Sequence, residues 1–104
     1  MKKFEIVKEH HDFDNIIQTG KYKKNNCFII YNKDSNYNYP RFGIAVGKKV
    51  GSAVVRNKLK RQVRMIISNN KNLFKNKQDY IIIVKRNALE HTFLELETSL
   101  KDII

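Results

Sequence analysis

The sequence places one amphipathic helix between two runs that are typical of β-strands. The first run, Arg41 to Val46, alternates apolar and other residues with a period of two. The second, Tyr80 to Val84, is an uninterrupted apolar run rich in β-branched residues, which suits a strand covered on both faces. Between them, Ser52 is a good N-cap, and apolar residues recur at helical spacing to about Ser68. A connection of helix length between two strands predicts a βαβ unit with parallel strands.

Shorter elements are predicted around this unit. A helix from about Glu9 to Thr19 has one apolar face, and Gly20 is the residue expected just past its end. The run Cys27 to Tyr31 is apolar and bounded by polar residues, which indicates a buried strand. Leu89 to Leu100 has the pattern of a closing amphipathic helix.

The remaining segments are predicted connections, apart from one candidate strand. Asn32 to Tyr39 is a polar loop, Gly47 to Gly51 a tight basic loop, and residues 69–78 an Asn/Lys-rich connector. Lys3 to Val7 is the candidate for a fourth strand. We therefore expect residues 1–104 to form one α+β domain, a two-layer α/β sandwich with a four-stranded sheet and three helices.

The net charge of +11 arises in one window of the sequence. Residues 35–78 carry eleven basic side chains and no acid, whereas the charges of the other residues cancel. Four of the five arginines lie between residues 41 and 64. An AT-rich codon bias scatters lysine but does not concentrate arginine, the side chain that binds phosphate with two parallel hydrogen bonds. The window predicts a polyanionic partner, with a nucleic-acid backbone as the first choice.

The predicted central helix carries its basic residues opposite its apolar face. This basic face comprises Arg56, Asn57, Lys58, Lys60, Arg61 and Arg64. It has no acid at i±3 or i±4, and half of it lies in the N-terminal part of the helix, where the dipole disfavours cations. Residues that oppose the stability of their own helix are explained better by a bound phosphate strand than by solvation alone.

Several classes of protein and site are not supported by the sequence. No run approaches the roughly 20 apolar residues of a membrane span, and no signal peptide is evident, so we expect a cytoplasmic protein. Cys27 is the only cysteine and is expected to be a buried structural thiol. The spacing of Cys and His does not suit zinc, and the glycines lack the spacing of a nucleotide loop. We expect neither catalytic residues nor a metal site on this chain.

Residues 41–64 read RFGIAVGKKVGSAVVRNKLKRQVR. This segment closely resembles the signature of the bacterial ribonuclease P protein subunit, in which a strand leads through Lys-Lys-x-Gly into Arg-Asn-x-x-Lys-Arg-x-x-Arg. Asp12 and Phe13 with Gly20, the run Phe28 to Tyr31, and the run from Asp79 onward also fall where that family has its first helix, first strand and last strand. The resemblance covers nearly the whole chain.

The resemblance implies a protein subunit of an endoribonuclease whose catalytic chemistry belongs to an RNA. In that family the RNA removes the 5′ leader of precursor tRNA with Mg²⁺, which is held through the RNA and substrate and not by the protein alone. The implied partners are the catalytic RNA and precursor tRNA, in a complex with one protein monomer per RNA. The implied fold is similar to a ribosomal protein fold and has a left-handed βαβ crossover, against the general preference for right-handed ones.

The resemblance also implies two sets of site residues. The basic face, with Lys48, would contact the catalytic RNA, and a cleft between the first helix and the sheet would bind the leader through Phe13, Ile17, Tyr31 and Lys49. Lys58 stands where the family usually has Arg, and Ile17 where a second aromatic residue is common. The second departure leaves the cleft with one fewer stacking surface.

Two other functions remain open at this stage. A free-standing ribonuclease would retain activity after rigorous removal of nucleic acid. A purely structural RNA-binding protein, such as a ribosomal component, would bind RNA without dependence on a leader. Phe13 itself has a simpler interpretation as a core residue of its helix.

Overall fold

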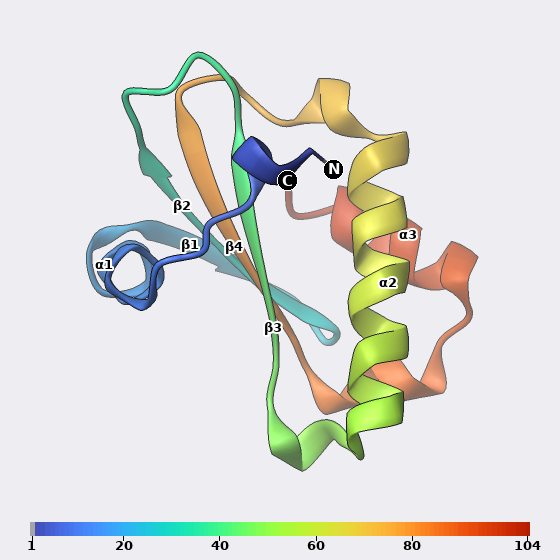
Figure 1. Ribbon diagram of the computed structural model, residues 1–104. Helices are drawn as coiled ribbons and strands as arrows, with labels where there is room; N and C mark the ends of the chain where they lie inside the picture. The colour runs from blue at the N-terminus through green and yellow to red at the C-terminus, as the bar shows by residue number, and fades with distance from the viewer. Residues whose placement is uncertain (1) are drawn as a thin grey trace.

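A computed structural model describes residues 2–104 as a four-stranded sheet with helices on both faces (Figure 1). The helices are α1 (His10–Thr19), α2 (Ala53–Asn69) and α3 (Phe93–Lys101), and the strands are β1 (Lys21–Lys24), β2 (Phe28–Asp34), β3 (Arg41–Val46) and β4 (Gln78–Val84). Short 3-10 turns are η1 (Lys3–Glu5), η2 (Lys48–Val50), η3 (Lys71–Leu73) and η4 (Arg86–Glu90). The α+β class predicted from the sequence is confirmed.

The sheet has the order β1-β2-β4-β3, with only β3 and β4 parallel. The predicted βαβ unit is therefore present, and β2 pairs antiparallel with β4 on its other side. In Figure 1, β3 runs downward in front of β4, α2 rises beside the sheet, and β4 runs downward behind β3. That path is a left-handed crossover, the uncommon hand.

The larger core lies between the sheet and α2 with α3. The apolar side of α2 buries Leu59, Val63, Ile66 and Ile67 against β-strand residues such as Phe28 and Ile82. Ser52 caps α2 as predicted, because its hydroxyl accepts a hydrogen bond from the Val55 amide at 3.4 Å. These two layers match the predicted sandwich, and α1 covers part of the opposite face over a smaller cluster (Figure 1). Among residues 2–104, no helix has both the length and the apolar character to cross a membrane.

Two sequence predictions need correction. Lys3 to Val7 is not the fourth strand: it begins with η1, and only Ile6 pairs there, in a single bridge to Phe42. The fourth strand is β1, all four residues of which are exposed, so it lacked the apolar alternation by which strands are recognised. Helix α3 begins at Phe93 instead of Leu89, since η4 precedes it. Thr92 and Glu95 form a capping box at this start, a sequence signature that predicts the boundary.

Gly20 follows α1 where expected, but for a different reason. Its backbone is extended, with φ −79° and ψ 165°, so the left-handed conformation that favours glycine at helix ends is not used. A Cβ atom there would lie 2.5 Å from the Ile16 carbonyl oxygen and 2.7 Å from that of Asn32. Glycine therefore allows α1 to end close against β2.

A buried ion pair holds the N-terminal turn on the connection after α2. Glu5 is 5% exposed, and both its carboxylate oxygens lie 2.6 Å from Lys71 Nζ. Burial by itself raises the pKa of the Glu5 carboxyl, but the hydrogen bonds from Lys71 and from the Lys2 backbone amide outweigh it and leave the pKa below its ordinary value.

We expect Glu5→Gln to remove part of the acid sensitivity of the fold. Because the pKa of Glu5 is lower in the folded state, the unfolded chain takes up the proton first, so stability falls as the pH drops from about 4.3 toward the lowered pKa. Urea unfolding between pH 7 and pH 3 should show that the free energy of unfolding falls less for Glu5→Gln than for Glu9→Gln, a control change at an exposed carboxyl. Equal pH dependence in the two variants would contradict this role.

Candidate nucleic-acid interface

The basic face of α2 points away from the larger core. Asn57, Lys58, Arg61 and Arg64 are exposed, while Arg56 and Lys60 are half-buried. None of the ion pairs formed within residues 2–104 involves a cation of this face. The face therefore presents a row of charges available to an anionic ligand.

Arg56 has an additional unusual feature. Its Nε atom is buried, and within the described part of the chain it finds no hydrogen-bond acceptor. A buried donor without a partner costs on the order of 1–3 kcal/mol, and such groups are uncommon in folded proteins. A guanidinium that turned outward to an acceptor on a ligand would no longer bear that cost.

Arg41, the first arginine of the basic window, is occupied within the fold. Its guanidinium donates to both carboxylate oxygens of Asp79, with Nε–Oδ1 2.8 Å and Nη2–Oδ2 2.6 Å. The side chains of Arg41 and Asp79 are only 13% and 8% exposed. The acid lies outside the window in sequence but beside Arg41 in the parallel register of β3 and β4. Arg41 therefore contributes little to the free charge of the window.

Lys48 and Lys49 lie in η2, between the end of β3 and the start of α2. Both side chains are exposed. Lys48 thus extends the basic face beyond the N-terminus of α2, where unpaired backbone amides also favour an anion.

The residues predicted for the cleft meet on the α1 face of the sheet. Phe13, Ile17 and Tyr31 all pack against the smaller cluster, whose buried members are Val7, Ile16 and Ile81. Each of the three predicted residues remains partly exposed. Lys49 belongs to η2, past the end of β3, and is not a member of this cluster.

Tyr22 is a residue of this face that the sequence reasoning missed. Pairing aligns Tyr22 with Tyr31 across β1 and β2, and their ring centroids lie 5.6 Å apart. Tyr22 is 59% exposed, so its ring extends the aromatic surface of Tyr31 toward solvent. The exposed β1 pattern gave no sign of this pairing, and only the register between the two strands reveals it.

A groove connects Phe13 with the basic helix. It has a volume of about 520 Å³ and runs along the second half of β3, between the segment before α1 and Lys60. Its lining includes Phe13 together with the basic residues Lys8 and Lys60 and the acidic residue Glu9. Lys60, predicted only for the basic face, therefore also borders the cleft.

Gly43 allows Phe13 to lie against the sheet. A Cβ atom on Gly43 would be 2.7 Å from Phe13 Cε2 and 2.7 Å from Ile81 Cδ1. We expect Gly43→Ala to lower the free energy of unfolding by about 1–3 kcal/mol, because both side chains must shift. Gly47→Ala, which would place its Cβ in open space, is the control and should change stability by less than about 0.5 kcal/mol in the same urea titration. Equal stabilities would show that Phe13 is not held against Gly43.

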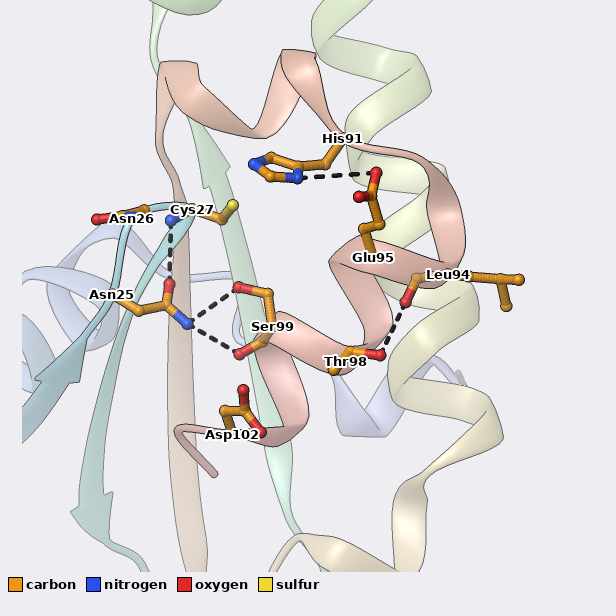
Figure 2. A pocket seen from close by; sticks show the side chains of 9 residues that line it. All are labelled: Asn25, Asn26, Cys27, His91, Leu94, Glu95, Thr98, Ser99 and Asp102. Atoms are coloured by element: carbon orange, nitrogen blue, oxygen red, sulfur yellow. Dashed lines mark hydrogen bonds and ion pairs between the residues drawn. The ribbon is translucent and has the colours of Figure 1, made fainter.

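A second hollow, of about 540 Å³, lies between α3 and the turn before β2 (Figure 2). Its polar groups largely bond to one another: the Asn25 side chain donates to Ser99 and accepts from the Cys27 amide, and His91 faces Glu95 at 3.8 Å. Cys27 is buried, as predicted for a structural thiol. These contacts tie α3 to the sheet and give this hollow a structural role.

The mixed sheet, the left-handed crossover and the basic face of α2 define a small basic α+β protein. Residues 1–104 match the family model described as Ribonuclease P. The chain belongs to the ribonuclease P protein family.

Individual relatives agree with the family match. The chain is 45% identical to the ribonuclease P protein component of Mycoplasma mycoides subsp. mycoides, over 100% of this chain and 96% of that one. It is 37% identical to the component from Bacillus cereus strain 03BB102, over 96% and 88%.

Solved structures of two further relatives have the same fold. A Staphylococcus aureus RNase P protein mutant with defective mRNA degradation activity superposes with a TM-score of 0.91 at 32% identity, over 97% of this chain and 86% of that one. The Thermotoga maritima RNase P protein gives 0.86 at 31%, over 94% and 93%. Family membership implies a role in tRNA 5′ processing, as a subunit of an endoribonuclease holoenzyme.

Proposed function

We propose that this chain binds the catalytic RNA of ribonuclease P through α2 and the 5′ leader of precursor tRNA through the cleft beside α1. The observation that supports the first contact best is the basic face, because none of its cations forms an ion pair within residues 2–104. An arginine guanidinium can bind a phosphate with two hydrogen bonds, whereas the ammonium group of Lys58 acts as a point charge. Binding of phosphates would also offset the unfavourable dipole interaction of Arg56 and Lys58.

The proposed leader contact is aromatic and tolerant of sequence. Leaders differ between tRNAs, and stacking with backbone charge accommodates different bases better than hydrogen bonding to base edges does. Phe13 and Tyr31 would supply the rings, and Ile17 an apolar wall. Tyr22 would supply the additional aromatic ring that Ile17 does not. Lys60 on α2 and Lys49 in η2, which follows β3, would attract the phosphates of the leader.

In this proposal the chain positions RNA and performs no chemistry. Among residues 2–104, no group of three His, Cys, Asp or Glu side chains is placed to hold a metal ion. Mg²⁺ would be held by the catalytic RNA and the substrate, where it supplies charge neutralisation for phosphodiester cleavage. We further propose one protein monomer per RNA, acting in the cytoplasm.

Reconstitution tests the proposal directly. The chain, freed of nucleic acid, is mixed with a bacterial ribonuclease P RNA and precursor tRNA at low Mg²⁺. We expect the chain to stimulate cleavage at the 5′ end of the mature tRNA and to show no cleavage without the RNA. Cleavage by the protein alone would favour a free-standing ribonuclease, and RNA binding without stimulation would favour a structural protein.

Tyr31→Ala is expected to weaken precursor tRNA binding roughly tenfold or more while leaving mature tRNA binding unchanged, since one stacked base contributes about 1–3 kcal/mol. Tyr22→Ala should weaken the same complex, because its ring continues the surface of Tyr31. Affinities of the holoenzyme for precursors with and without a leader provide the measurement.

Tyr31→Phe and Tyr22→Phe separate stacking from other effects, because they keep the rings. Near-normal leader affinity in both supports stacking, and thermal melting of the alanine variants checks that each is folded. If folded Tyr31→Ala binds precursors with a long leader and precursors without a leader as tightly as the unmodified chain does, then Tyr31 only packs against α1.

A further inference from the structure

A second group of aromatic rings lies near Arg41, where β3 begins, whereas α2 follows the other end of this strand. We call Phe4, Tyr37 and Tyr39 the aromatic ladder. The Phe4 and Tyr39 rings meet edge to face with centroids 4.7 Å apart, and the Tyr37 and Tyr39 centroids are 5.4 Å apart. Phe4 is 51% and Tyr37 44% exposed. Tyr39, which lies between them, is half-buried. Two exposed rings that adjoin a third differ from the singly scattered apolar residues of an ordinary surface.

Buried ion pairs hold the ladder from both sides. The Arg41 guanidinium lies 4.3 Å from the centroid of the Tyr37 ring and is itself fixed by Asp79. Phe4 belongs to η1, which the contacts of Glu5 with Lys71 and with the Lys2 amide hold in place. Rings that are already ordered lose little conformational freedom when a ligand stacks on them.

The charge around the ladder favours an anion. Of the neighbouring carboxylates, Glu5 is paired with Lys71, whereas Asp12 and Asp79 share Arg41, which leaves one negative charge against the two positive charges of Lys2 and Lys3. Lys2 Nζ lies 5.8 Å from the centroid of the Phe4 ring, and Lys2 and Lys3 are exposed. Neither lysine side chain forms an ion pair within residues 2–104. A partner that combines planar rings with negative charge suits this surface.

We propose that the aromatic ladder is a second binding site for single-stranded RNA, on which unpaired bases stack while Lys2 and Lys3 contact the phosphates. Exposed aromatic rings beside cations are the common basis of sequence-tolerant single-strand binding. Asn36 and Asn38 alternate with the two tyrosines in sequence and are exposed. The six residues of β3, roughly 20 Å in length, separate this site from Lys48 and α2. The site is therefore separate from the α2 contact of the proposed function, and Arg41 places it beside Asp12 on α1, next to the Phe13 end of the cleft.

A single tryptophan provides the test, because the chain contains none. Tyr37→Trp places a fluorescent reporter in the ladder, and Leu94→Trp places a matched one on α3, where Leu94 is 70% exposed. Each variant is titrated with a ten-nucleotide oligouridylate and with an abasic oligomer of equal length. We expect oligouridylate to quench Tyr37→Trp, the abasic oligomer to leave it nearly unchanged, and Leu94→Trp to respond to neither.

Removing the rings tests how much they contribute to the affinity for oligouridylate. Tyr37→Ala combined with Tyr39→Ala should weaken oligouridylate binding about tenfold or more, and the corresponding pair of phenylalanine substitutions should restore it. Arg61→Ala combined with Arg64→Ala should leave the quenching of Tyr37→Trp intact, so that loss of the α2 contact and loss of the ladder are distinguished. Equal quenching by the abasic oligomer, or unchanged affinity in the folded alanine variant, overturns the proposal. An RNA-independent dimer that the alanine variant abolishes also overturns it, because the ladder is then a self-association surface.

Discussion

Asp79→Ala is expected to lower the free energy of unfolding by about 3 kcal/mol or more, the range measured when one partner of a buried ion pair is removed. The Arg41 side chain is only 13% exposed, and the change removes the acceptor of both hydrogen bonds that its guanidinium donates from β3 to β4. Since typical domains have only about 5–15 kcal/mol of stability, the effect should be obvious in a urea titration.

Asp12→Ala is the control for this prediction. Its carboxylate lies 4.0 Å from the same guanidinium but is 41% exposed, so its loss should cost less than about 1 kcal/mol. Replacing Arg41 and Asp79 together by Met and Leu should recover much of the loss, because no buried charge is then left unpaired. Similar destabilisation by Asp12→Ala and Asp79→Ala would mean that overall charge, and not this pair, is responsible.

The sequence predicted the parts of the fold that local patterns determine. Ser52 and the apolar spacing after it marked α2 almost to the residue, because helix caps and periodicity are properties of neighbouring positions. The exposed lysine-rich β1 was missed, because its only structural requirement is pairing with β2. Long-range pairing leaves little trace in a sequence when neither face of the strand is buried.

The same distinction applies to the candidate sites. The grouping of Arg61 and Arg64 on one face follows from the geometry of a single helix. The neutralisation of Arg41 by Asp79 and the pairing of Tyr22 with Tyr31 depend on strand register. The prediction from sequence therefore assigned too much free charge to Arg41 and too little aromatic surface to the face around Tyr31.

The largest functional effect is expected from Arg61→Ala combined with Arg64→Ala. Both side chains are exposed on the middle of α2 and form no ion pair within residues 2–104, so the variant should fold with a stability change of at most about 1 kcal/mol. If each arginine contacts phosphate, affinity for the ribonuclease P RNA should fall about a hundredfold, at roughly 1.4 kcal/mol for each charge-assisted contact. Plotted against the logarithm of salt concentration, the logarithm of affinity should have a slope flatter by somewhat less than two, since each lost contact no longer releases its counterion.

A charge-matched variant decides whether position or net charge is responsible. Arg86→Ala combined with Lys101→Ala removes the same two charges from exposed positions outside α2. We expect this variant to keep most of the affinity and nearly the original slope, because general attraction by a +11 chain changes little with two remote charges. Arg61→Lys adds a finer comparison: it keeps the charge and the slope but loses the guanidinium fork, so affinity alone should drop. Equal slopes for the two double variants would show that α2 is a solvated basic surface, and the RNA contact would then have to lie elsewhere on the chain.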